Sequence, residues 1–216
     1  MGVAAEVLPK PRYRGASHLW AFVVAVPLFI LVARFAPSAG ARAAAIVYAV
    51  GVCTMLGTSA AFHRVDWTPA QHRLMGRFDH SAIFLAIAGT YTPVALICLD
   101  GPGRVLVAIA VWGGGLVGIA LQWTPFEPPR WLLTLLYVTV GWAAFFVLPQ
   151  LYDSIGVLGV GLLLAGGLSY TAGAIVYALR WPDPWPASFG FHEVFHAFVV
   201  LGAALQLSAI FFVVLP

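Results

Sequence analysis

Seven long apolar stretches divide the chain, and they constrain its fold more than any other feature. Each is long enough for a bilayer core, which a helix crosses in about 20 apolar residues. The chain is 62% hydrophobic and only 9% charged, so a soluble surface cannot enclose it. We predict an all-α integral membrane protein, a single seven-transmembrane helix bundle over residues 1–216. The predicted spans are approximately 18–36, 43–64, 78–98, 103–122, 131–149, 156–179 and 191–215.

The segments between the spans predict the orientation, because Lys and Arg collect on the cytoplasmic side of a membrane. With a cytoplasmic N-terminus, the inner segments hold Lys10, Arg12, Arg14, Arg64, Arg73, Arg77, Arg130 and Arg180. The outer segments then hold only Arg34, Arg42 and Arg104. We therefore expect the N-terminus inside and the C-terminus outside. The net charge of +3 reflects this topology, so we expect no nucleic-acid partner.

The first apolar stretch follows a basic leader and precedes small residues, a pattern that also occurs in cleaved signal peptides. Its apolar part is longer than a usual signal core. We favour a helix that is retained in the membrane.

A few polar side chains inside the spans are the most informative residues, because such groups are costly in hydrocarbon and need a partner or a purpose. Ser59 and His63 lie one turn apart near the end of the second span, and Asp79 opens the third. His192 and His196 lie one turn apart at the start of the seventh. In the predicted topology all five fall at one depth, at the cytoplasmic end of the bundle.

The histidines have the spacing of a metal site. His192 and His196, four residues apart, present both imidazoles on one helical face, and two such nitrogens reach one zinc ion at about 2.0–2.1 Å. His63 is the natural third ligand, which leaves a fourth position open for water. Asp79 would hydrogen-bond this water or act as its base, with the metal lowering the water's pKa toward about 7. Ser59 could orient a ligand or a substrate carbonyl.

Ordinary structural roles compete with this interpretation. Asp79 precedes an apolar run and could be the N-cap of its helix, and Ser59 could serve helix packing. The three histidines could form a structural network, although their convergence at one depth favours a metal. Each of the other histidines, taken alone, is expected to be structural; these are His18, His72 and His80.

A second pattern uses the same histidines. Residues 192–196 read His-Glu-Val-Phe-His, formally the H-E-x-x-H signature in which two histidines bind zinc and the glutamate is a general base. It suggests an intramembrane metalloprotease that uses Glu193. Such an enzyme needs a carboxylate ligand from another span, and Asp100 lies at the wrong depth, which leaves Asp79. We rank this reading third and expect Glu193 at the membrane interface.

Several motifs together resemble the hemolysin III family, the bacterial branch of the progestin and adipoQ receptor (PAQR) proteins, which are related to alkaline ceramidases. The resemblance covers nearly the whole chain. The motifs are Arg-Gly-Ala-Ser-His (14–18), Ser-Ala-Ala-Phe-His-Arg (59–64), Phe-Asp-His-Ser (78–81) leading into Gly-Thr-Tyr-Thr-Pro (89–93), and Gly-Phe-His-Glu-Val-Phe-His (190–196).

The resemblance implies seven helices in a bacterial cytoplasmic (inner) membrane and zinc held by His63, His192 and His196. It implies that Asp79 contacts the zinc-bound water, with Ser59 close by. The ceramidase relatives imply a zinc-dependent hydrolase that acts on a lipid amide or ester. The alternative is a membrane-homeostasis or lipid-sensing protein with a structural zinc and no turnover. In either case the expected partners are membrane lipids, including a lipid substrate or ligand.

Overall fold

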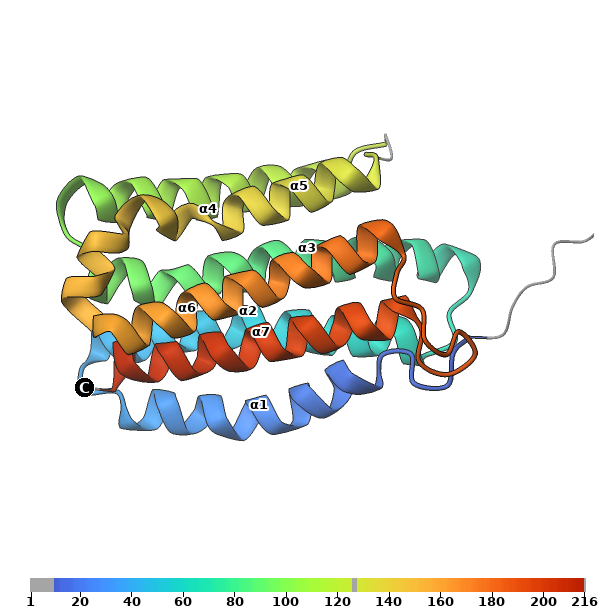
Figure 1. The fold of residues 1–216 in the computed structure, drawn as a ribbon, viewed down its shortest axis with the longest axis horizontal. Coiled ribbons are helices and arrows are strands. Elements are labelled where there is room, and N and C mark those ends of the chain that lie inside the picture. The colour runs from blue at the N-terminus through green and yellow to red at the C-terminus, as the bar shows by residue number, and fades with distance from the viewer. Residues whose placement is uncertain (1–9, 126–127, 216) are drawn as a thin grey trace, which may run out of the picture.

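A computed structural model describes residues 10–125 and 128–215. Over these residues the chain is helical and contains no strand, only one isolated bridge between Trp185 and Phe189. Figure 1 shows the helices lying roughly along one long axis. Their bounds are α1 (Ala16–Phe35), α2 (Ala39–Arg64), α3 (Pro69–Pro93), a π-helical turn η1 (Val94–Cys98), α4 (Gly101–Gln122), α5 (Arg130–Gly141), a 3₁₀ turn η2 (Ala143–Val147), α6 (Leu148–Leu179) and α7 (Phe191–Val214).

Six of the described helical segments are long and apolar enough to cross a membrane. Their outward faces carry large apolar side chains: Trp20 is 68% exposed, Leu116 is 61% exposed and Val157 is 74% exposed. Apolar side chains in such number on an outer surface require lipid as the solvent. The chain is therefore an all-α integral membrane protein, as the sequence predicts.

The third helix begins well before its predicted span. The prediction started this span at residue 78, whereas α3 begins at Pro69. The Thr68 side chain accepts a hydrogen bond from the Gln71 backbone, and the Gln71 side chain accepts one from the Thr68 backbone amide, which is a capping box. The first turns of α3 are polar, so a search for apolar stretches does not detect them. The capping box and Pro69 nevertheless start the helix at this point. Asp79 lies ten residues inside α3, so the N-cap interpretation of Asp79 is wrong.

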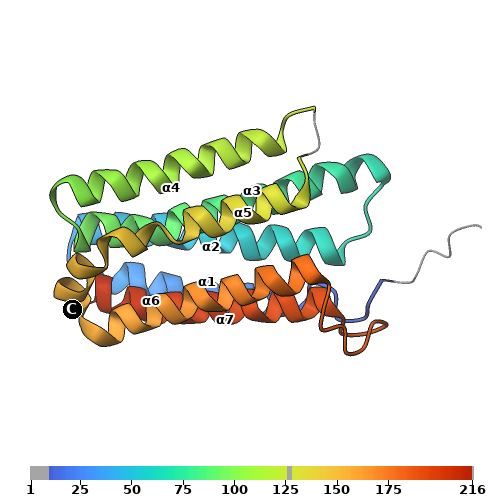
Figure 2. The ribbon, with the colours of Figure 1, turned by 45° about the horizontal axis from the view of Figure 1, so that its top comes forward.

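The region of the fifth and sixth predicted spans forms one apolar helical stretch of 49 residues, Trp131–Leu179. At 1.5 Å per residue it would be about 73 Å long, more than twice a bilayer core of about 30 Å. The chain doubles back within it: α5 ends at Gly141, η2 follows, and α6 bends where Gly156 adopts a φ of 66°. Figures 1 and 2 show α5 and α6 running side by side. The predicted break between residues 149 and 156 is helical, and the count of seven crossings stays a prediction.

Close packing of α2 on α3 positions the site. A Cβ atom added to Gly51 would collide with the backbone of Leu85, and one on Gly89 would come within 3.0 Å of the Val47 carbonyl. Two glycines therefore let the helix backbones approach closely. The four-residue connection Val65–Thr68 makes the two helices antiparallel neighbours. Figure 2 shows α6 and α7 lying side by side and the α4–α5 pair on the α3 side, while α1 packs against α2 and α7.

Candidate functional site

The three predicted histidine ligands meet at the end of the bundle where α2 ends and α7 begins. One nitrogen of each of His63, His192 and His196 lies within 4.8 Å of the other two. The Nε2 atoms of His63 and His192 are 3.2 Å apart. His63 and His196 are buried, and His192 is half-buried. The cluster thus joins the last turn of α2 to the first turns of α7.

This arrangement fits a metal ion. A tetrahedral ion with nitrogen ligands at about 2.0–2.1 Å holds those nitrogens about 3.3–3.4 Å apart. The observed 3.2 Å between His63 and His192 is close to that separation. Two imidazoles at 3.2 Å could also share one hydrogen bond, but the third nitrogen within 4.8 Å makes a three-donor set. The cluster could therefore hold a metal ion.

Asp79 and Ser59 lie beside the cluster. The Asp79 Oδ2 atom is 4.0 Å from the Nε2 atom of His63. The Ser59 hydroxyl is hydrogen-bonded to the Asp79 side chain. Both residues are more than nine-tenths buried. The five residues singled out in the sequence are therefore gathered at one place, with the carboxylate next to the histidines.

Glu193 is placed differently from the other members of its motif. Its Oε1 atom accepts a hydrogen bond from the Arg14 Nε atom in a partly buried ion pair, and its Oε2 atom accepts one from the Gly190 backbone at 2.8 Å. Only 2% of Glu193 is exposed. Both carboxylate oxygens are therefore engaged in holding the start of α7. This arrangement does not favour a general base next to a metal.

The segment before α1, together with its first turn, lies across this end of the bundle. The backbone amides of Arg12 and Tyr13 donate to the carbonyls of Ala187 and Ser188 at 3.3 and 3.1 Å. Gly15 adopts a φ of 74°, and a Cβ atom there would lie 2.7 Å from the Cβ of His63. We call residues 11–18 the N-terminal segment. It closes the histidine end of the bundle against α2 and the start of α7.

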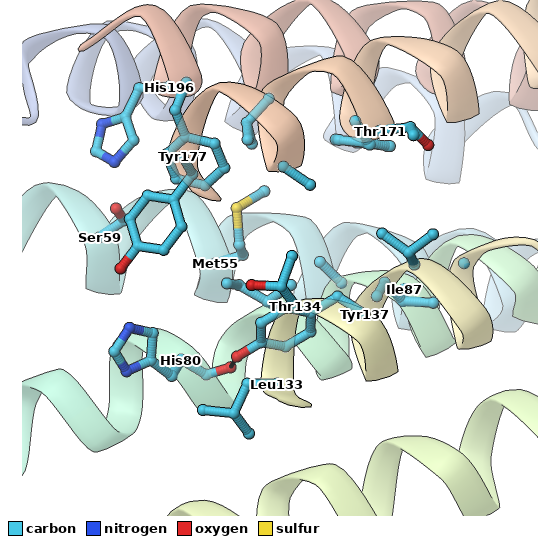
Figure 3. Close-up of a pocket in the computed structure, with 18 of the residues that line it drawn as sticks. Met55, Ser59, His80, Ile87, Leu133, Thr134, Tyr137, Thr171, Tyr177 and His196 are labelled. Carbon is cyan, nitrogen blue, oxygen red and sulfur yellow. Dashed lines mark hydrogen bonds between the residues drawn. The ribbon is translucent and has the colours of Figure 1, made fainter. Parts of the chain in front are cut away.

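A cavity of about 250 Å³ extends from the histidines along the bundle interior. Ser59, Asp79 and all three clustered histidines line its polar end. Figure 3 shows His196, Ser59 and Tyr177 close together, with Ile87 and Thr171 further along the cavity. The rest of the wall is mainly apolar and comes mostly from α3, α5 and α6, with further side chains from α2 and α7; it includes Ile83, Ile87, Leu133, Val138 and Ala174. The donor cluster thus opens directly into an apolar space.

Comparison with known proteins places the chain among membrane proteins of one family. A family model described as Haemolysin-III related matches residues 7–207. The chain belongs to the Haemolysin-III related family. It is 34% identical over 206 residues to Hemolysin-3 of Bacillus cereus, covering 93% of this chain and 90% of the relative. It is 29% identical over 201 residues to the Hemolysin-3 homolog of Bacillus subtilis (strain 168), covering 91% and 90%.

This Haemolysin-III related chain is also similar to a receptor protein. It is 28% identical over 180 residues to the Adiponectin receptor protein of Drosophila melanogaster, covering 74% of this chain but 40% of the relative. The resemblance to hemolysin III and PAQR proteins, drawn from the motifs, is therefore confirmed.

Sequence reasoning missed several residues of this Haemolysin-III related site. His18 was interpreted as structural, but its ring lines the cavity and stacks on His196. A signal existed, since the start of the first span lies at the same predicted depth as His63. His80, which stands in the motif at 78–81 but was interpreted as structural, also lines the cavity. Tyr137 and Tyr177 line it too, and they lie in none of the motifs.

Proposed function

We propose that this chain is a zinc-dependent membrane hydrolase that cleaves a lipid amide or ester. The observation that supports this proposal most is the direct opening of the histidine cluster into an apolar cavity. A structural metal needs no such space, whereas hydrolysis of a lipid needs metal and lipid side by side. The cavity of about 250 Å³ is equivalent to roughly eight water molecules at about 30 Å³ each. We propose that it takes the acyl chain next to the bond that is cleaved.

The site residues would have different roles in hydrolysis. His63, His192 and His196 would hold the zinc ion, which, when bound, supplies a Lewis acid that polarises an acyl carbonyl and acidifies a water molecule. Asp79, beside His63, would accept a proton from the attacking water and pass it to the leaving amine or alcohol. Ser59 would hold the Asp79 carboxylate in position through their hydrogen bond.

The proposed topology is a single domain of seven spans with a cytoplasmic N-terminus, in a bacterial inner membrane. The 49-residue stretch Trp131–Leu179 supports two crossings because of its length and its doubling back. In this orientation the site lies at the cytoplasmic end of the bundle. The N-terminal segment covers that end, so we propose that the lipid approaches from within the bilayer.

A second candidate is a lipid-sensing or membrane-homeostasis protein in which the same cluster holds a structural zinc. The similarity to a protein named as a receptor favours it. This candidate needs a bound lipid but no turnover. We do not propose the metalloprotease, because both oxygens of Glu193 are engaged by Arg14 and Gly190.

Turnover of defined lipids distinguishes the two candidates. The purified protein in detergent is incubated with fluorescent N-acyl amino alcohols and matched esters, before and after chelation and after zinc is restored. The proposal predicts hydrolysis of at least one class, lost on chelation and recovered with zinc. Saturable lipid binding with retained zinc but no hydrolysis of either class would contradict the hydrolase and support the sensor.

A further inference from the structure

His18 is a buried histidine that the proposed hydrolysis does not use. It lies in the first turn of α1 and is 2% exposed. Its ring stacks on the ring of His196, with centroids 3.9 Å apart and planes inclined by 9°. Its ring nitrogens make no hydrogen bond of good geometry with the described residues, although the His196 backbone interacts with this ring. A polar side chain so placed needs an explanation, because burying poorly hydrogen-bonded nitrogens is costly.

The stacked ring is fixed from two sides. The partly buried ion pair of Arg14 and Glu193 holds the N-terminal segment against the start of α7. Gly15 packs on His63, and the Leu19 amide donates to the Gly15 carbonyl at 3.1 Å, which starts α1. His18 follows Gly15 by three residues. Its ring is therefore held against His196 by contacts that reach both α2 and α7.

None of the described residues forms a hydrogen bond with the Nδ1 atom of His196. A metal-bound histidine normally donates its second ring N–H to a carboxylate, a carbonyl or a water. The Nδ1 atom of His196 is buried and has no partner among the residues that the structure describes. The face of the ring is instead covered by His18. A metal on His196 would draw electron density from its ring, which strengthens stacking with a neutral imidazole.

We propose that His18 is a positioning residue that fixes the ring plane of His196 by stacking and so raises the affinity of the cluster for its metal. The proposal rests on the metal site of the proposed function. The geometry gives His18 no place as a fourth ligand, because the described group of donors within 4.8 Å of one another contains His63, His192 and His196 alone.

Three substitutions of His18 distinguish the effect of the stacked flat ring from the effect of its nitrogens and from the effect of side-chain volume. His18→Phe keeps a flat ring without nitrogens, His18→Leu keeps much of the volume without a ring, and His18→Ala keeps neither. His72→Ala is the control, because His72 is exposed and its ring contacts Phe62 rather than any histidine of the cluster. Helical circular dichroism and a monodisperse elution profile establish that each variant is folded.

The measurement is the rate at which zinc leaves the protein for a chelator, with the visible spectrum of the cobalt-substituted protein as a second readout. We expect His18→Leu and His18→Ala to release zinc at least about tenfold faster than wild type and to change the cobalt spectrum. We expect His18→Phe and His72→Ala to stay within about threefold of wild type. If the alanine variant does not fold, the comparison of Phe with Leu decides.

Each other result overturns a specific statement. Equal loss in His18→Phe and His18→Leu would show that the nitrogens matter rather than the stacked plane. Wild-type rates in both His18→Leu and His18→Ala would show that His18 positions nothing. A wild-type protein that holds no zinc would overturn the proposed metal site itself, and this inference with it.

Discussion

The polar end of the cavity is walled by side chains that hold one another in place, whereas the body of the cavity is walled by side chains that leave space. At the polar end His18 stacks on His196, and Ser59 is hydrogen-bonded to Asp79. In the body, a Cβ atom added to Gly141 would meet nothing within 4 Å. Fixed groups suit a reaction that needs exact placement, and open space suits a ligand of variable length. Substitutions at the two places should therefore have different consequences.

The largest effect is expected from Asp79→Asn at the polar end. An amide cannot accept a proton, so hydrolysis should fall by about 10²–10⁴-fold. Zinc content should stay unchanged, since Asp79 is outside the three-histidine group. Steady-state hydrolysis and metal analysis of the same sample check this. Asp100→Asn, a side chain that is 95% exposed, is the control and should behave as wild type. Undiminished hydrolysis by Asp79→Asn would show that the Asp79 carboxylate does not act as the base.

The next largest effect is expected from Arg14→Gln. This change removes the charged partner of the buried Glu193 carboxylate, which should lower the free energy of unfolding by about 3–5 kcal/mol. Arg104→Gln breaks an exposed pair with Asp100 and should change it by less than about 1 kcal/mol. Unfolding of both variants in a denaturing detergent compares them. Equal stability of the two would mean that the N-terminal segment is not anchored by this pair.

A smaller effect is expected from Gly15→Ala, with Gly101→Ala as its match. Both glycines have positive φ, 74° and 53°, so alanine should cost each about 1–2 kcal/mol of stability. Only at Gly15 would the new methyl group displace His63, since nothing lies within 4 Å at Gly101. Zinc content should therefore fall in Gly15→Ala and stay normal in Gly101→Ala. Equal zinc in both would contradict the role of Gly15 in placing His63.

The smallest effect is expected in the body of the cavity. Gly141→Leu should fill part of the space and lower kcat/KM for the longest acyl chains by about tenfold, while short chains are affected less. Gly161→Leu adds the same side chain at an exposed position that also has no neighbour within 4 Å. Hydrolysis rates across a series of chain lengths measure the difference. A uniform loss over all lengths would argue against an acyl-chain role for this part of the cavity.

Apolar patterning predicted much of the fold. The predicted starts of the first, fourth and seventh spans lie within two residues of α1, α4 and α7, because lipid-facing helices are apolar along their length. It failed at α3, where Thr68 and Gln71 begin a polar helix that no apolar pattern marks. It also misplaced the turn between the fifth and sixth predicted spans, because residues 149–155 are helical and the chain bends at Gly156 instead.

For the site, the informative quantity was the predicted depth of each polar residue in the membrane. His63, Asp79 and His192 come from three different helices, and the expectation that they share one depth brought them together correctly. The motif around Glu193 was misleading, because local spacing cannot show that Arg14 reaches the carboxylate from another segment. His18 was missed because it was considered alone, although its predicted depth matched that of His63; its stacking partner is 178 residues away in the sequence.

Zinc binding by the histidine cluster is tested by metal analysis of the detergent-solubilised protein, purified without chelators, beside folded His63→Ala, His192→Ala and His196→Ala variants and the His72→Ala control. We expect about one zinc per chain in wild type and in the control, and loss of zinc in each of the three cluster variants. Wild-type protein without zinc, or cluster variants that keep it, would show that these histidines do not form a zinc site.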